Sequence, residues 1–207
     1  MRPVYLYDDN EARDDHGRWT DGDSGATSGG GSGKAKTADE WSKSLTPKEQ
    51  AAIEFWKYGD YNTMRKDIMS GKLNEQEQTF KDALARAPSF EGIAYRGMKN
   101  VPEPCLKDLL TVGTTIELKA PSSWTKYESQ SRKFFDYDKS SVRMVVDLKK
   151  NGVDLNEQEK GNANYEAEVV VKGGSFKVTK VEAGSKDFGP TDSTVPRNYH
   201  VIHLQEL

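Results

Sequence analysis

The chain has 207 residues, of which 34% are hydrophobic and 30% are charged. This is a low apolar content for a chain that is folded throughout, so we expect one domain accompanied by an unstructured segment. The net charge of −3 gives no support to nucleic-acid binding through bulk positive charge and leaves only a local basic patch. The single cysteine, Cys105, excludes an internal disulfide and a zinc site built from cysteines.

No apolar run near the N-terminus resembles a signal peptide. No segment approaches the roughly 20 apolar residues that a membrane-spanning helix needs. We therefore expect a soluble protein of a reducing compartment, with no membrane partner.

Residues 1–37 have the composition of a tail and linker. Glycine makes up six of the twelve residues from Gly22 to Gly33, which is typical of a flexible coil. The stretch GGGSGKA is not a phosphate-binding P-loop, because Ser28 stands at the first glycine position and Ala35 at the position of the Mg-binding hydroxyl. The prediction is a disordered segment over 1–37 and one folded domain over 38–207.

Helices are predicted in the first part of the domain. Thr46-Pro47-Lys48-Glu49 is typical of a helix start, with a capping threonine, a first-turn proline and a glutamate three residues after the cap. That helix is expected to stop at Gly59, and two more are predicted over 61–69 and 74–87. Their apolar stripes, one of which includes Trp56, indicate core packing.

Short strands dominate from Pro88 onward. The pattern predicts strands over 93–97, 115–118, 141–148, 165–171, 175–181 and 199–204, with helices over 102–110 and 128–135. Gly173-Gly174 predicts a tight hairpin between the strands on either side of it. The predicted fold class is α+β, a helical N-terminal part followed by a mostly antiparallel sheet region.

Several familiar chemistries are excluded by the motifs. The histidines are His16 in the tail and His200 and His203 on opposite faces of the last strand, so no cluster has metal-ligand spacing and no metal is expected. There is no G-x-S-x-G motif of a serine hydrolase, and no G-x-G-x-x-G joins a strand to a helix.

Ala94-Tyr-Arg-Gly97 places an arginine near the end of a strand, followed by a glycine. A guanidinium in that position can bind a phosphate or pyrophosphate through two hydrogen bonds, and Gly97 allows a ligand to approach the backbone. The alternative is that Arg96 is a surface residue of an edge strand.

Pro121-Ser-Ser-Trp-Thr125 places hydroxyl groups and one large aromatic ring near a strand end. The hydroxyls can bind a ribose and support a neighbouring carboxylate, and the Trp124 indole can cover a flat ring. The alternative is a turn with a partly buried tryptophan.

Asn164-Tyr-Glu-Ala-Glu-Val-Val-Val171 places two glutamates on one predicted strand. Alternation puts Glu166 and Glu168 on the same face, roughly 6.6 Å apart along the chain. A carboxylate pair suits glycosyl transfer, in which one group stabilises an oxocarbenium-like sugar and the other assists the nucleophile. The alternative is a solvent-facing edge that carries charges against aggregation.

The order of these three motifs resembles the mono-ADP-ribosyltransferases of the arginine-serine-glutamate class. The stretch LTPKEQAAIEFWKYGDYNTMRKDI and the later DALARAP are similar to the helical lead-in of bacterial-toxin and tailed-phage members, so the resemblance runs from about Leu45 to the C-terminus. It implies a two-sheet NAD-binding core, with NAD as substrate and no metal. The implied reaction transfers ADP-ribose to arginine side chains of host bacterial proteins and releases nicotinamide.

The resemblance also implies roles for individual residues. Arg96 would hold the NAD phosphates, and Gly97 would bind the nicotinamide amide through its backbone. Ser123 and Thr125 match the first and last residues of the serine motif, with Trp124 between them, and Ser122 stays open as an alternative by one residue. Glu168 would bind the nicotinamide ribose and stabilise the oxocarbenium ion. A glutamate at the upstream position, here Glu166, implies that arginine is the acceptor. Residues 161–165 would recognise the target.

Other outcomes of the same resemblance stay open. Water as acceptor would make the chain an NAD glycohydrolase, and NAD-capped RNA as donor would attach RNA to the protein, although the near-neutral charge argues against RNA. A silent binding module of a phage particle is a third possibility. The N-terminal DDHGRWTDGD resembles junctions in phage head-associated proteins. This predicts a phage origin and action in the host bacterial cytoplasm after delivery with the virion.

Overall fold

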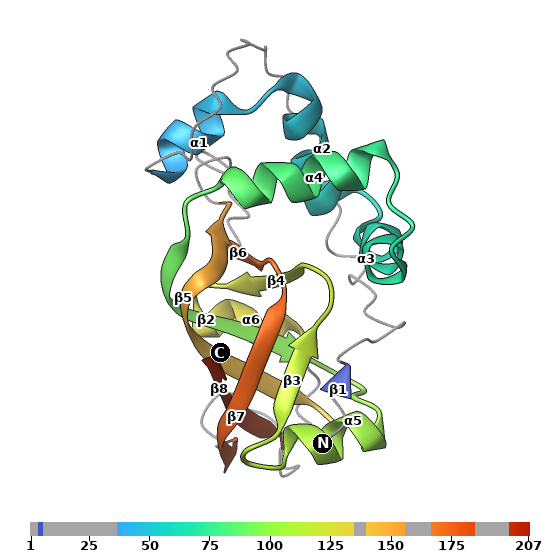
Figure 1. The fold of residues 1–207 in the computed structure, drawn as a ribbon. Coiled ribbons are helices and arrows are strands. Elements are labelled where there is room, and N and C mark those ends of the chain that lie inside the picture. The colour runs from blue at the N-terminus through green and yellow to red at the C-terminus, as the bar shows by residue number, and fades with distance from the viewer. Residues whose placement is uncertain (1–3, 6–36, 135–139, 156–166, 185–198) are drawn as a thin grey trace.

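A helical layer stacked on one end of a curved sheet forms the protein (Figure 1). The computed structural model describes residues 4–5, 37–134, 140–155, 167–184 and 199–207. The predicted α+β class, with a helical N-terminal part ahead of a mostly antiparallel sheet, is confirmed. Within the described residues, no helix is both long and apolar enough to span a membrane.

Four helices make the layer: α1 (Ala38–Ser44), α2 (Pro47–Tyr58), α3 (Tyr61–Ser70) and α4 (Glu75–Arg86). Local sequence sets their ends. Capping boxes begin α1, α2 and α4 at Thr37, Thr46 and Asn74, so each cap side chain binds a backbone N–H that the helix leaves unpaired. Gly71 ends α3 in the left-handed conformation at φ 73°. The helix start at Thr46 and the stop at Gly59 are confirmed.

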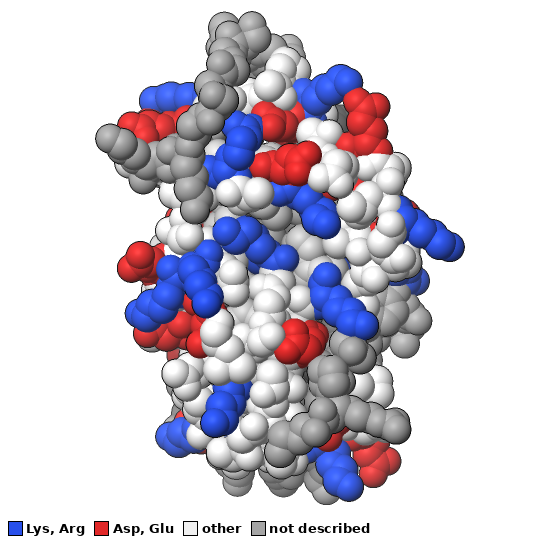
Figure 2. All heavy atoms as spheres, viewed as in Figure 1, with Lys and Arg blue, Asp and Glu red and all other residues white. Residues whose placement is uncertain are grey.

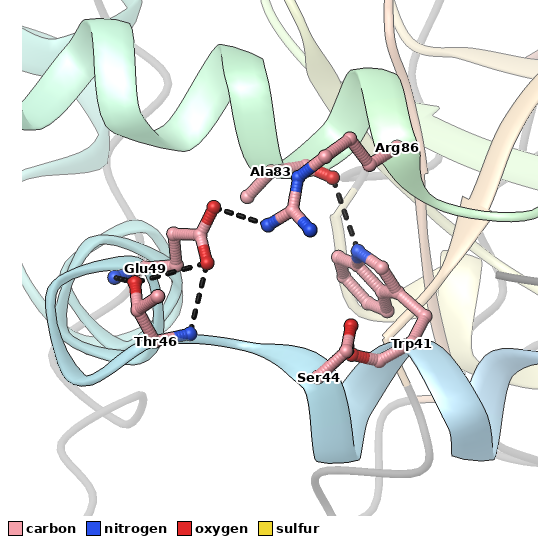
Figure 3. A network of polar contacts seen from close by, with 6 residues as sticks. All are labelled: Trp41, Ser44, Thr46, Glu49, Ala83 and Arg86. Carbon is pink, nitrogen blue, oxygen red and sulfur yellow. Dashed lines mark hydrogen bonds and ion pairs between the residues drawn. The ribbon is translucent and has the colours of Figure 1, made fainter. Parts of the chain in front are cut away.

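The helices share one core and are also tied by polar contacts (Figure 3). The indole Nε1 of Trp41 donates to the backbone oxygen of Ala83 at 3.0 Å, which joins α1 to α4. The Glu49 carboxylate accepts from the Thr46 backbone N–H at 2.9 Å and forms an ion pair with Arg86, which joins α2 to α4. These contacts tie the helices to one another independently of the sheet.

The described strands form one continuous sheet in the order β1-β3-β7-β8-β5-β2-β4-β6, with β6 also paired to β5. Their bounds are β1 (Val4–Tyr5), β2 (Phe90–Met98), β3 (Thr115–Leu118), β4 (Ser122–Thr125), β5 (Val142–Asp154), β6 (Glu168–Val171), β7 (Gly174–Ala183) and β8 (His200–Glu206). The pairs β1–β3 and β5–β8 are parallel and the others antiparallel. Because every strand from β2 to β8 contributes to one core, the two halves of the sheet curl around it rather than separating.

Three short elements complete the described chain. Helix α5 (Glu103–Leu109) packs Leu109 on the sheet core at the end opposite the helical layer (Figure 1). Helix α6 (Glu128–Ser131) runs directly into the 3₁₀ turn η1 (Arg132–Phe134). The predicted helix over 128–135 is thus shorter and divided.

Strand β6 lies between the two hydrophobic cores. Val169 and Val171 belong to the core inside the sheet, whereas Val170 belongs to the core shared with the helical layer. All residues of this strand are buried, because its opposite faces serve different cores. The position of β6 decides where its first residue, Glu168, points.

One hairpin prediction was wrong, and one predicted strand is longer than expected. Gly173 and Gly174 do have positive φ angles, of 122° and 120°, but they do not close a hairpin. Both edges of β6 are occupied by β4 and β5, so the chain crosses to pair β7 with β3 and β8. The strand predicted over 141–148 continues to Asp154: residues 152–154 pair with β6, and the Glu206 carboxylate accepts the backbone N–H groups of residues 149–151.

The segment expected to be a tail contributes one element. Val4–Tyr5 pairs in parallel with β3, inside the range 1–37 for which no order was predicted. Residues 1–3 and 6–36 lie outside the described residues, and so does the Gly/Ser-rich linker.

Candidate active site

Glu168 begins β6 and faces the helical layer. It lies two residues before Val170, on the same side of the strand, and only 4% of its surface is exposed. On the neighbouring β4, Thr125 lies opposite Glu168 and Ser123 lies opposite Val170. The antiparallel register therefore places Ser123, Thr125 and Glu168 on one face.

Two donors from distant parts of the chain bind one oxygen of this carboxylate. The hydroxyl of Ser123 donates to Oε1 of Glu168 at 2.5 Å, and the indole Nε1 of Trp56 donates to the same atom at 3.2 Å. No described residue donates to Oε2. Among the described residues, the carboxylate is thus held through one of its two oxygens.

Arg96 is connected to the same group through the backbone of β4. It lies on β2, is 9% exposed, and its NH1 donates to the carbonyl oxygen of Ser123 at 2.5 Å. Strand β2 also pairs with β4 where Tyr95 meets Thr125. Three motifs separated in the sequence therefore meet at β4, and Ser123 contacts both of the others.

Ser122 and Trp124 lie on the opposite face of β4. The Trp124 ring is part of the core inside the sheet and is 3% exposed, and its Nε1 donates to the Ser122 hydroxyl at 2.9 Å. Because the side chains of a strand alternate, the residues flanking Ser123 cannot share its face. The structure brings Ser123 to Glu168 and does not bring Ser122 or the Trp124 indole there. The expectation that this indole covers a bound ring has no support from its buried position.

Thr125 and Gly97 border the site. Thr125 is 4% exposed, and its hydroxyl accepts the Tyr127 backbone N–H at 3.1 Å, which shapes the turn into α6. Gly97 is buried on β2 directly after Arg96, opposite Arg143 of β5. Arg143 itself is paired with Glu128 of α6 at 2.5 Å, so α6 is anchored beside the site.

Glu166 and residues 161–165 lie outside the described residues. The strand predicted over 165–171 begins at Glu168, because Ala167 has a φ of 53° and is not extended. The alternation argument that placed Glu166 on the face of Glu168 therefore does not hold through Ala167. A non-glycine residue in the left-handed region carries strain of about 1 kcal/mol, and such strain is concentrated at functional sites.

Comparison with solved structures identifies the fold. No protein-family model matches the sequence, and a search of curated proteins finds no match. The Vis toxin, an ADP-ribosyltransferase from Vibrio splendidus, is 21% identical over 82% of this chain and 81% of its own, with a TM-score of 0.58. The enzymatic component C2-I of the Clostridium botulinum C2 toxin is 16% identical over 84% of this chain, with a TM-score of 0.60.

This chain has the ADP-ribosyltransferase fold. Exoenzyme S from Pseudomonas aeruginosa matches as well, at 14% identity over 78% of this chain and 74% of its own, with a TM-score of 0.52. The match to C2-I covers 47% of that protein, so this chain spans about half of its length.

Within this ADP-ribosyltransferase fold, Glu168 is a buried carboxylate that is bound by neutral donors. A buried carboxylate is ordinarily stabilised by a cation, because the loss of hydration is expensive otherwise. Among the described residues Glu168 has no ion pair, and its donors are a neutral hydroxyl and a neutral indole. Among the described residues, this carboxylate is therefore held in place by neutral groups alone.

Trp56 is the site residue that sequence reasoning missed. Its helical spacing assigned it to the core, and the structure does bury it completely in the core of the helical layer. The signal that could have found it is the indole N–H, since a buried tryptophan needs an acceptor for that group.

Proposed function

We propose that this chain transfers ADP-ribose from NAD to a protein side chain and releases nicotinamide. The observation that carries the proposal is the buried Glu168 carboxylate, which is held through one oxygen by Ser123 and Trp56 without a cationic partner among the described residues. Such a group suits a reaction in which positive charge develops on a bound sugar.

The reaction breaks the glycosidic bond between the nicotinamide nitrogen and C1 of its ribose. The bonding electrons leave with nicotinamide, and the ribose becomes an oxocarbenium-like cation. Glu168 accepts a hydrogen bond from the ribose through Oε2 and lowers the energy of that cation. Ser123 keeps the carboxylate oriented, and the Arg96 guanidinium binds the phosphates while it holds the Ser123 carbonyl at 2.5 Å. A nucleophile then attacks C1 and loses a proton.

Arginine is the acceptor that we propose. A guanidinium is a poor nucleophile while it is protonated, so an adjacent carboxylate has a chemical role, and the resemblance implies that Glu166 has this role. The Vis toxin has been crystallised with agmatine, which carries the same guanidinium group as arginine. Exoenzyme S has been crystallised with carba-NAD, an analogue of the donor.

The charge distribution fits a nucleotide and a protein better than an RNA chain. On the face shown in Figure 2, described basic and acidic side chains are interspersed over the helical layer, and basic groups gather where this layer meets the sheet. An RNA donor would favour an extended basic groove. NAD, with two phosphates, needs only a local positive site such as Arg96.

The test is the transfer of label from adenylate-labelled NAD to proteins of a bacterial lysate. The lysate is bacterial because the N-terminal DDHGRWTDGD resembles junctions in phage head-associated proteins. Wild type should label discrete bands, and Glu168→Gln should label none while circular dichroism and melting show an intact fold. Glu166→Gln should lose arginine labelling and retain most nicotinamide release.

The alternatives give different results. Nicotinamide release without labelled protein, by both wild type and Glu166→Gln, would indicate an NAD glycohydrolase. Labelling that requires NAD-capped RNA would indicate the RNA donor. Neither labelling nor nicotinamide release by wild type would reject the transferase and favour a silent binding module.

A further inference from the structure

The contact between Trp56 and Glu168 joins residues 112 positions apart in the sequence. Trp56 is near the end of α2 in the helical layer, and Glu168 begins β6 in the sheet. Both are buried, with exposures of 0% and 4%. The hydrogen bond is therefore shielded from water. In such a buried environment, a bond to a charged acceptor is stronger than one between neutral groups.

The indole of Trp56 is fixed in direction by two aromatic neighbours. It stacks on Phe80 of α4 with ring centroids 4.6 Å apart and an interplanar angle of 18°. It also meets the Tyr61 ring of α3 edge-on, at 4.5 Å and 73°. Three helices thus clamp this ring, and its single N–H cannot turn away from Glu168 without repacking the layer.

The geometry of the carboxylate explains what this fixed donor does. Ser123 and Trp56 both bind Oε1, one from β4 and the other from α2. With one donor alone, the carboxylate can rotate about that bond. With two donors from different elements its plane is set, and Oε2 has a defined direction.

We infer that Trp56 is a positioning residue for Glu168, so that the helical layer orients the group that acts on the ribose. This inference rests on the proposed function. It gives the helical layer a role in the reaction in addition to its role in packing. The apolar stripe of α2 alone indicates only packing. A neutral donor suits the part, because a lysine or arginine in its place would cancel the charge of Glu168.

Trp41 provides a matched control. It is buried in the same layer, 1% exposed, and its Nε1 also donates a single hydrogen bond, at 3.0 Å. Its acceptor is the backbone oxygen of Ala83, so this bond joins α1 to α4 (Figure 3). Replacement of either tryptophan by phenylalanine removes an indole N–H and reduces buried ring area in the same core.

The first test does not depend on activity. In ¹⁵N-labelled protein, Glu168→Gln should shift the indole N–H resonance of Trp56, because the charged acceptor becomes neutral. The resonance of Trp41 should stay in place. An unchanged Trp56 resonance would overturn the inference, even if Trp56 variants proved too unstable to assay.

The second test separates positioning from packing. Trp56→Phe should lower kcat for nicotinamide release about tenfold, the size expected for one lost hydrogen bond to a charged group, with the KM for NAD changed less than about twofold. Trp41→Phe should lose comparable thermal stability without a change in kcat. Equal kcat values for the two variants, or a rise in KM with kcat preserved for Trp56→Phe, would contradict a positioning role. If wild type releases no nicotinamide, the proposed function fails first, and the resonance test still decides the contact.

Discussion

Glu49 and Glu168 are both carboxylates shielded from solvent, yet the protein holds them in opposite ways. Glu49 in the helical layer is paired with the cationic Arg86 and with the cap residue Thr46, and its side chain is 12% exposed (Figure 3). Glu168 at the start of β6 is bound only by the neutral groups of Ser123 and Trp56 among the described residues. Glu49 has a cationic partner, and Glu168 has none among the described residues.

The difference separates a stabilising carboxylate from a candidate catalytic one. A carboxylate paired with a cation can join two helices. It attracts a positively charged ligand little, because the two opposite charges nearly cancel in their potential at the ligand. An unpaired one is unfavourable for folding and keeps its negative potential for an incoming positive charge. Removal of each charge should therefore act on a different property: turnover for Glu168 and its donors, and stability for Glu49.

The largest effect after loss of Glu168 itself is expected at Ser123. Ser123→Ala should lower the rate of nicotinamide release between about ten- and a hundredfold, because it removes the shorter of the two bonds that orient Glu168. Ser122→Ala is the matched control. Its hydroxyl binds Trp124 on the other face, so it should keep the rate and lose about 1 kcal/mol of stability. Reversed effects at the two serines would mean that the register of the serine motif is displaced by one residue.

In the helical layer, Arg86→Met should act on stability. It leaves the Glu49 carboxylate without its cation, and we expect the free energy of unfolding to fall by about 2 kcal/mol. Urea denaturation measures this, and nicotinamide release per folded molecule should not change. In Glu49→Gln/Arg86→Met the two losses should be less than additive, because they remove one interaction. Full additivity would show that the ion pair contributes nothing.

The pH dependence of stability should also follow Glu49. Burial raises the pKa of this carboxyl, but hydrogen bonds from Thr46 and Arg86 outweigh burial, so its pKa lies below the ordinary value of 4.5. A carboxyl whose pKa is lower in the folded state contributes stability above its unfolded pKa and loses it as pH falls through the folded pKa. Between about pH 5 and 3, wild type should therefore lose more stability than Glu49→Gln. Parallel acid-denaturation curves would count against this.

Local signals explain what the sequence predicted well. Thr46, Asn74 and Gly71 set helix ends through contacts within one turn, so neighbouring residues suffice to place them. The order Arg96, Ser123, Glu168 also led to residues that the structure connects through hydrogen bonds. Their roles in the proposed reaction are still predictions.

Contacts between distant residues explain what the sequence did not predict. The Gly173-Gly174 pair allows positive φ in a hairpin and in a crossover alike, and only the occupied edges of β6 decide between them. The extension of β5 depends on its pairing with β6 and on Glu206, which is more than fifty residues away. The Trp56 contact depends on how the helical layer stacks against β6, which no local pattern records.

The smallest effect is expected from a second ion pair between the same two helices. Lys48 and Glu75 join α2 to α4 at 2.6 Å, and each lowers the energy of the other charge, which raises the pKa of Lys48 and lowers that of Glu75. Their side chains are 79% and 78% exposed, so water and salt screen the attraction and ordering two long side chains opposes it. Lys48→Gln should leave the melting temperature unchanged within error, beside the clear loss in Arg86→Met. Equal losses of melting temperature in Lys48→Gln and Arg86→Met would contradict this. They would show that burial does not decide how much an ion pair stabilises the helical layer.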